Sequence, residues 1–154
     1  MKTISNTWIF QANPQKYDIM NALADDKLEG IIHWAVRQHK QDISQGDRGI
    51  IWLSGKKAGI YAITEILTDP ELLSESESEK KYWIDDTDEK GKITRVKMRI
   101  VINLRNSPIT KETIRNILGL QEMSILKAPR GTNFEVKPNE WILIEKILHE
   151  TNSL

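Results

Sequence analysis

The sequence predicts an α+β fold built on a curved, mixed or antiparallel sheet or a partly closed β-barrel, flanked by short helices. Extended segments outnumber helical ones, and the two kinds follow one another without the regular strand–helix alternation of a parallel sheet. Residues 46–61 read as two strands joined by a tight turn. A length of 154 residues fits a single domain, and no linker composition divides it, so we expect one domain over residues 1–154.

The hairpin is the clearest local signal in the chain. Its first apolar run covers 49–53, its second covers 58–66, and the polar residues 54–57 connect them. Gly55 permits a positive φ in that connection. Trp52 beside this small turn has two interpretations: a buried core side chain, or a flat wall that holds a planar ring such as a nucleobase.

The other elements follow from apolar spacing, capping residues and breakers. Asp18 and Thr110 are suited to begin helices, and Pro138 suits the first turn of another. A polar loop with a glycine covers 128–134. In chain order the expected elements are a strand at 7–12, a helix at 17–23, an extended piece at 31–36, a strand at 92–104, a helix at about 110–118 and a closing helix at 138–149.

Charge is distributed unevenly although the net charge is zero. The segment 71–89 carries eight acidic residues and two lysines, and we expect an acidic loop there. The strand at 92–104 instead places Arg95, Lys97 and Arg99 on one face. These cations have two interpretations, contacts to nucleic-acid phosphates or a plain solvated face.

Several classes of function lack any supporting motif. The chain has no cysteine, and its three histidines are scattered without metal-ligand spacing, so we expect no metal and no cofactor. Carboxylates such as Asp47, Glu65, Asp85 and Asp86 do not pair with a histidine in a recognisable catalytic pattern, so we expect no enzyme activity. No apolar stretch could span a bilayer and no signal peptide is evident, which predicts a cytoplasmic protein without a membrane partner.

A set of short motifs nevertheless stands in a characteristic order. The set comprises 8–14 (WIFQANP), Trp34, Gly46-Asp47, 51–55 (IWLSG), 59–62 (GIYA), Tyr82-Trp83, 131–134 (GTNF) and Trp141 in the closing helix. Together these motifs resemble the EVE domain of the PUA-like superfamily, a relative of the YTH domain, over nearly the whole chain. The closest resemblance is to EVE domains that stand alone or are fused to bacterial restriction enzymes.

The resemblance implies a small β-barrel flanked by helices, which takes a flipped, modified base into an aromatic pocket. Trp34 is then a pocket wall, with Trp52 or Trp83 as a second one. Polar groups of the pocket correspond to Gln11, Asn13, Ser54 and Gly55, and the loop at its mouth to Arg130, Thr132 and Asn133. Two positions depart from the family pattern. Ala12 offers no side-chain donor, which leaves the choice of base open, and Lys137 stands in place of a Ser/Thr cap.

Three functions remain open at this level. The first is a non-catalytic module that binds DNA with a modified base, most plausibly a modified cytosine, either alone or with a separate nuclease or restriction component. The second is a reader of modified RNA nucleotides, because contacts to the 2′-hydroxyl cannot be read from a sequence. The third is an enzyme acting on a nucleotide-like small molecule.

Overall fold

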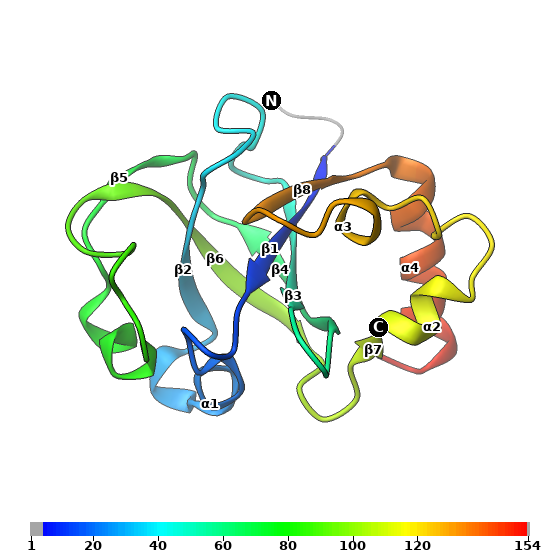
Figure 1. Cartoon of the computed structure of the whole chain (residues 1–154), viewed down its shortest axis with the longest axis horizontal. Helices are drawn as coiled ribbons and strands as arrows, with labels where there is room; N and C mark the ends of the chain where they lie inside the picture. Colours follow the sequence, from blue (N-terminus) through cyan, green and yellow to red (C-terminus); the bar gives the residue numbers. More distant parts are fainter. Residues whose placement is uncertain (1–4, 154) are drawn as a thin grey trace.

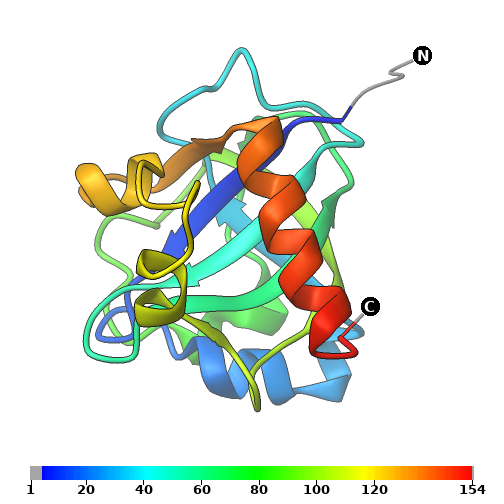
Figure 2. The same cartoon turned by 90° about the vertical axis from the view of Figure 1, so that its right-hand side faces the viewer.

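The computed structural model describes residues 5–153, which form a curled mixed sheet with the shape of a half-barrel (Figures 1 and 2). The strands are β1 (Thr7–Ala12), β2 (Ile31–Ala35), β3 (Arg48–Leu53), β4 (Gly59–Ile66), β5 (Glu71–Leu73), β6 (Ile93–Asn103), β7 (Ile109–Thr110) and β8 (Asn133–Val136). The helices are α1 (Ile19–Ala24), η1 (Asp26–Leu28), η2 (Glu77–Tyr82), α2 (Lys111–Arg115), α3 (Ser124–Lys127) and α4 (Pro138–Glu150).

The sheet has the strand order β2-β6-β4-β3-β1-β8, with β5 added to β6 and β7 added to β4. β1 pairs with β3 in parallel, and the other pairings are antiparallel. A parallel pair needs a long crossover connection. Here the crossover contains α1 and β2, so the first half of the chain passes around the curl before it returns to β3.

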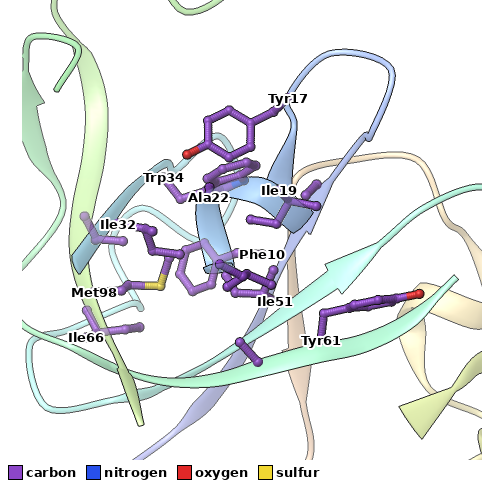
Figure 3. Packing of buried hydrophobic residues seen from close by; sticks show 14 of the residues in the cluster. Phe10, Tyr17, Ile19, Ala22, Ile32, Trp34, Ile51, Tyr61, Ile66 and Met98 are labelled. Carbon is purple, nitrogen blue, oxygen red and sulfur yellow. The ribbon is translucent and has the colours of Figure 1, made fainter. Parts of the chain in front are cut away.

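Each face of the sheet covers its own hydrophobic core, because successive side chains of a strand point to opposite faces. Phe10 and Ile51 belong to the first core, which is closed by α1 and is shown in Figure 3. Ile9 and Ile50 belong to the second core. The second core lies beneath α4, which crosses the sheet in Figure 2, and α2 and α3 also contribute to it.

The predicted α+β class with a curved sheet is confirmed. The hairpin corresponds to β3 and β4, and the strands at 7–12 and 92–104 correspond to β1 and β6. Within residues 5–153 the sheet has eight strands, more than the number of extended segments predicted from the sequence. β5 and β7 are too short to show a period, and β8 begins within residues 128–134, whose polar composition predicted a loop.

A buried carboxylate fixes the start of the parallel pair. Asp47 is fully buried, and its Oδ2 accepts hydrogen bonds from Trp8 Nε1 and from the Ser44 backbone N–H, both at 2.9 Å. Its Oδ1 accepts from the Asn6 backbone N–H at 3.2 Å. The side chain therefore joins β1, the segment before it and the turn that leads into β3.

Asp47→Ala should lower the free energy of unfolding by about 3 kcal/mol, because it leaves the buried Trp8 indole N–H and two part-buried backbone N–H groups without an acceptor, and an unsatisfied buried donor costs about 1–3 kcal/mol. Asp69→Ala is the matched control, since Asp69 also accepts from a backbone N–H, that of Gln45 at 2.8 Å, but is exposed. Urea unfolding of both variants measures the difference. Equal losses of stability would contradict this account of Asp47.

Candidate functional site

A hollow of about 510 Å³ lies beside the end of β1, between the acidic segment and the loop before β8. We call it the tryptophan hollow. Its lining residues are Gln11, Asn13, Lys16, Tyr17, Trp34, Ala35, Arg37, Ser54, Trp83, Asp88, Glu89, Pro129, Arg130, Gly131 and Thr132. They come from β1 and the segment after it, from β2 and the segment after it, from the β3–β4 turn and from the two loops, so only the folded chain brings them together.

Two indole rings form its aromatic part. Trp34 on β2 and Trp83 after η2 have ring centroids 5.8 Å apart and ring planes inclined by 24°. Tyr17 meets both rings edge-on, at centroid distances of 4.9 Å from Trp34 and 4.6 Å from Trp83. Figure 3 shows Tyr17 beside Trp34 at the margin of the first core.

The two tryptophans differ in how firmly they are held. Trp34 is only 5% exposed, and its Nε1 donates to the Gln11 carbonyl oxygen at 3.2 Å. Trp83 is half-buried. A flat ring between two others needs roughly 7 Å, twice the carbon–carbon contact distance of about 3.5 Å. Because the centroids are 5.8 Å apart, such a ring could enter only if Trp83 moved outward.

Two amide side chains supply oriented hydrogen-bonding groups. Gln11 Nε2 donates to the carbonyl oxygens of Pro129 at 2.9 Å and Gly131 at 2.8 Å, which leaves its Oε1 as an acceptor. Asn13 Oδ1 accepts from the Gln15 backbone N–H at 2.9 Å, which leaves its Nδ2 as a donor. The hollow therefore offers an acceptor and a donor beside the aromatic rings.

The charged groups at the rim are mostly paired. Lys16 Nζ lies 3.6 Å from an Asp88 carboxylate oxygen, and Arg37 Nη2 donates to Glu89 Oε1 at 2.5 Å. Arg130 is exposed and makes no ion pair with another residue between 5 and 153. It is the rim cation best placed to meet an anion from outside.

The acidic segment, residues 71–89, was predicted as a loop, but it contains two regular elements, β5 and η2. Glu79 in η2 is only 3% exposed. Its carboxylate accepts from the His33 backbone N–H at 3.1 Å and the Tyr17 hydroxyl at 3.3 Å, and lies 2.8 Å from His33 Nδ1. Burial, followed by the charge of Glu79, raises the pKa of Tyr17 far above its usual value.

Arg95 closes this segment at both ends. Its buried guanidinium donates to the carbonyl oxygens of Leu73 and Glu89, and to that of Gly91 at 3.1 Å. The chain between these carbonyls carries Trp83. Arg95 therefore holds the base of the loop that supplies one aromatic wall.

The structure places these predicted residues at the tryptophan hollow: Gln11, Asn13, Trp34, Ser54, Trp83, Arg130 and Thr132. Gly55 lies outside it, in a neighbouring hollow. Trp52 does not line it either, because Trp52 shares with Ile9 and Ile50 the face that the C-terminal helices cover. Of its two interpretations, the structure supports the core side chain.

Four other predicted contact residues do not line the tryptophan hollow. The Asn133 amide is buried: Oδ1 accepts from the Arg37 backbone N–H at 2.7 Å and Nδ2 donates to the Ala35 carbonyl at 3.0 Å. The Arg95 guanidinium is bound to the carbonyl oxygens of Leu73, Glu89 and Gly91. Lys97 is half-buried, and Arg99 pairs with Glu65 at 2.9 Å. Strand alternation predicted that the three cations of β6 share one face of the strand. It could not predict which groups from other segments contact that face.

Some lining residues had no sequence signal. Tyr17 precedes a helix, and Lys16 and Arg37 lie in polar stretches without a period. Asp88 and Glu89 belong to the acidic segment, whose composition predicts solvent exposure. Across residues 5–153, no group of three His, Cys, Asp or Glu side chains could hold a metal ion, and no helix is long and apolar enough to cross a membrane.

The curled mixed sheet with its few short helices defines a PUA-like fold. The sequence profile of the EVE domain matches residues 6–147, so the chain belongs to the EVE domain family, and the resemblance stated above is confirmed. No curated protein sequence matches the chain.

Solved structures agree with this assignment. A hypothetical protein from Leishmania major is 17% identical, with a TM-score of 0.69 over 97% of this chain and 98% of that one. Rpa0253 from Rhodopseudomonas palustris is 21% identical, with a TM-score of 0.66 over 92% and 91%. The human THYN1 protein, solved with 5-methylcytosine-containing DNA, is 15% identical, with a TM-score of 0.62 over 93% and 97%. At these identities the likeness concerns the fold.

Arg95→Met should loosen the loop that carries Trp83. A hydrogen bond to a charged group is worth about 1.5–3 kcal/mol, so local opening should speed amide exchange at Trp83 and Ile84 at least about tenfold. Exchange in β1 should change less. Arg99→Met is the control, because Arg99 is an exposed arginine of the same strand. The same acceleration in both variants would show that Arg95 does not hold the loop.

Proposed function

We propose that the protein is a binding module that captures a modified base, flipped out of DNA, in the tryptophan hollow. The observation that carries this proposal is the pair of nearly parallel indoles, Trp34 and Trp83, beside oriented amide groups. Support also comes from the human THYN1 protein, a structural neighbour that was solved with 5-methylcytosine-containing DNA. A modified cytosine is therefore the ligand we favour.

The energies are compatible with selective capture. Extruding a base from a duplex costs a few kcal/mol. Stacking on an aromatic side chain returns roughly 1–3 kcal/mol per base. Burying one methyl group adds only about 1 kcal/mol. Discrimination between modified and unmodified cytosine thus depends on a close fit around the added group, and Trp83 completes that fit when it closes over the base.

The polar groups match the edge of a cytosine. Gln11 Oε1 is an acceptor for the exocyclic N4 amino group, which is a donor. Asn13 Nδ2 is a donor for the ring nitrogen or carbonyl oxygen on the same edge. Ser54 adds a hydroxyl that can donate or accept. Trp34 remains in place as the inner wall, since its ring is buried and hydrogen-bonded.

We propose binding without catalysis. The carboxylates of the hollow, Asp88 and Glu89, are paired with cations, and no histidine among residues 5–153 lines the hollow. Cleavage of the recognised DNA would then require a separate nuclease or restriction component. The same aromatic hollow could hold an RNA base, so RNA carrying the same modification belongs in the test as a competitor.

Trp83→Ala should weaken binding to an oligonucleotide with one 5-methylcytosine about tenfold to a hundredfold, the loss of one stacking wall of roughly 1–3 kcal/mol. Trp83 is a better test than Trp34, whose removal would also open the core. Trp141→Ala is the matched control, because Trp141 is also half-buried but lies on α4 against Arg48. Fluorescence titrations against the same oligonucleotide with and without the methyl group measure the effect. Unchanged affinity of Trp83→Ala would overturn the proposal.

Arg130→Ala should weaken binding of methylated and unmethylated oligonucleotides alike, because phosphate contacts carry no sequence information. The slope of log K against log salt concentration should become shallower by about 1. Titrations at several salt concentrations measure this slope. A loss confined to the methylated oligonucleotide would instead place Arg130 at the base.

A further inference from the structure

A second hollow of about 500 Å³ adjoins the β3–β4 turn, and we call it the basic hollow. Its lining residues are Gly55, Lys56, Lys57, Ala58, Tyr61, Pro108, Thr110, Lys111, Glu112 and Arg115. Four of them are cations and one is a carboxylate. Neither the motifs of the sequence nor the tryptophan hollow accounts for this concentration of positive charge.

The fold creates the basic hollow by a close backbone approach. Gly59 at the start of β4 faces β7, and a Cβ at this position would lie 2.4 Å from the Ile109 carbonyl oxygen. The absence of a side chain lets β7 pair with β4 there, and the Lys111 backbone N–H donates to the Ala58 carbonyl at 2.9 Å. The pairing brings Lys111 and Arg115 of α2 against the turn that carries the other two lysines.

The turn itself is held firmly. Gly55 has a φ of +94°, which a glycine adopts without strain. The buried Tyr61 donates its hydroxyl to the Lys57 carbonyl oxygen at 2.7 Å, and Figure 3 shows this hydroxyl directed away from Trp34 and Tyr17. Tyr61 therefore supports the floor of the basic hollow from the margin of the first core.

Within residues 5–153 the four cations of the basic hollow are not held in ion pairs, and Glu112 is the one carboxylate among its lining residues. None of Lys56, Lys57, Lys111 and Arg115 makes an ion pair within residues 5–153, whereas Lys16 and Arg37 at the tryptophan hollow both do. Like charges gathered around one concavity repel one another, and their field concentrates anions there. An anionic ligand would satisfy them together.

The two hollows share a boundary. Ser54 lines the tryptophan hollow and the next residue, Gly55, lines the basic hollow. The acidic segment, with β5 and η2, lies on the opposite side of the molecule from β7 and α2 in Figure 1. A polyanion that reaches the tryptophan hollow is thus repelled on one side and attracted on the other.

We propose that the basic hollow binds backbone phosphates of the DNA strand next to the flipped base. This inference rests on the proposed function, because it assigns the strand that carries the base to a path across the Ser54–Gly55 boundary. The lysines and the arginine contact phosphates, so they contribute affinity and salt dependence but no discrimination between bases.

The test uses the double variant Lys56→Gln/Lys57→Gln. Its control is Lys40→Gln/Lys137→Gln, which also removes two exposed positive charges, but from residues that line neither hollow. Both are titrated at several salt concentrations with a double-stranded oligonucleotide carrying 5-methylcytosine, with its unmethylated form, and with the free 5-methylcytosine nucleoside. Thermal melting of each variant checks that it is folded.

For Lys56→Gln/Lys57→Gln we expect the slope of log K against log salt concentration to be shallower by about 1.8 than that of the unaltered protein, about 0.9 for each lost phosphate contact on a duplex. The ratio of affinities for methylated and unmethylated oligonucleotides, and nucleoside binding, should not change. Lys111→Gln/Arg115→Gln, which alters the opposite side of the same hollow, should give the same pattern.

Other outcomes separate this inference from the proposed function. If methylated DNA binds preferentially but Lys56→Gln/Lys57→Gln behaves as its control does, the basic hollow is not the phosphate site and the inference is overturned. If both oligonucleotides bind equally and the variant still lowers the salt slope, the phosphate site stands while selective base capture fails. If no oligonucleotide binds, both are overturned.

Discussion

The parallel pairing of β1 with β3 is the constraint on which the rest of the structure depends. It requires a crossover, and this crossover carries Trp34 on β2 around the curl to the end of β1. The buried Asp47 carboxylate fixes the start of the pair through Trp8 and Ser44. At the other end, Ser54 donates its backbone N–H to the Ala12 carbonyl at 3.0 Å. The tryptophan hollow forms where this pair ends, so its geometry depends on bonds made along the whole length of β1.

Buried charged side chains hold the acidic segment, which supplies the Trp83 side of the tryptophan hollow. Glu79 joins η2 to His33 and Tyr17, and Arg95 binds carbonyl oxygens at both ends of the acidic segment. Buried charged groups are costly unless they are fully hydrogen-bonded, and here each one fixes backbone that has little apolar packing of its own. Trp83 packs against the margin of the first core and against Tyr17, on a loop held by these polar contacts, whereas Trp34 lies within that core. For this reason the proposed function assigns the outward movement to Trp83.

In the function we propose, the two hollows divide recognition between them. The tryptophan hollow has aromatic rings, oriented amides and paired rim charges, which suits a planar ligand that is read by fit and hydrogen bonds. The basic hollow has unpaired cations, which suits a polyanion held without regard to sequence. Consecutive residues at the β3–β4 turn line different hollows, Ser54 the tryptophan hollow and Gly55 the basic hollow. A strand that occupied both would gain affinity at one and selectivity at the other.

Local patterns determined most of the fold. Alternation and turn residues were enough to predict β1, β3, β4 and β6, and the capping residues Asp18 and Thr110 begin their helices as expected. The family resemblance predicted Trp34 and Gln11 at one site but left Trp52 or Trp83 as its second wall, and the structure has Trp83 there. Only the tertiary structure decided the rest: Trp52 is buried by helices distant in sequence, Arg95 is occupied by carbonyls of another loop, and four cations from two separate segments meet at the basic hollow. Periodicity reports which side chains share a face of one element, but what covers that face depends on contacts between residues far apart in the chain.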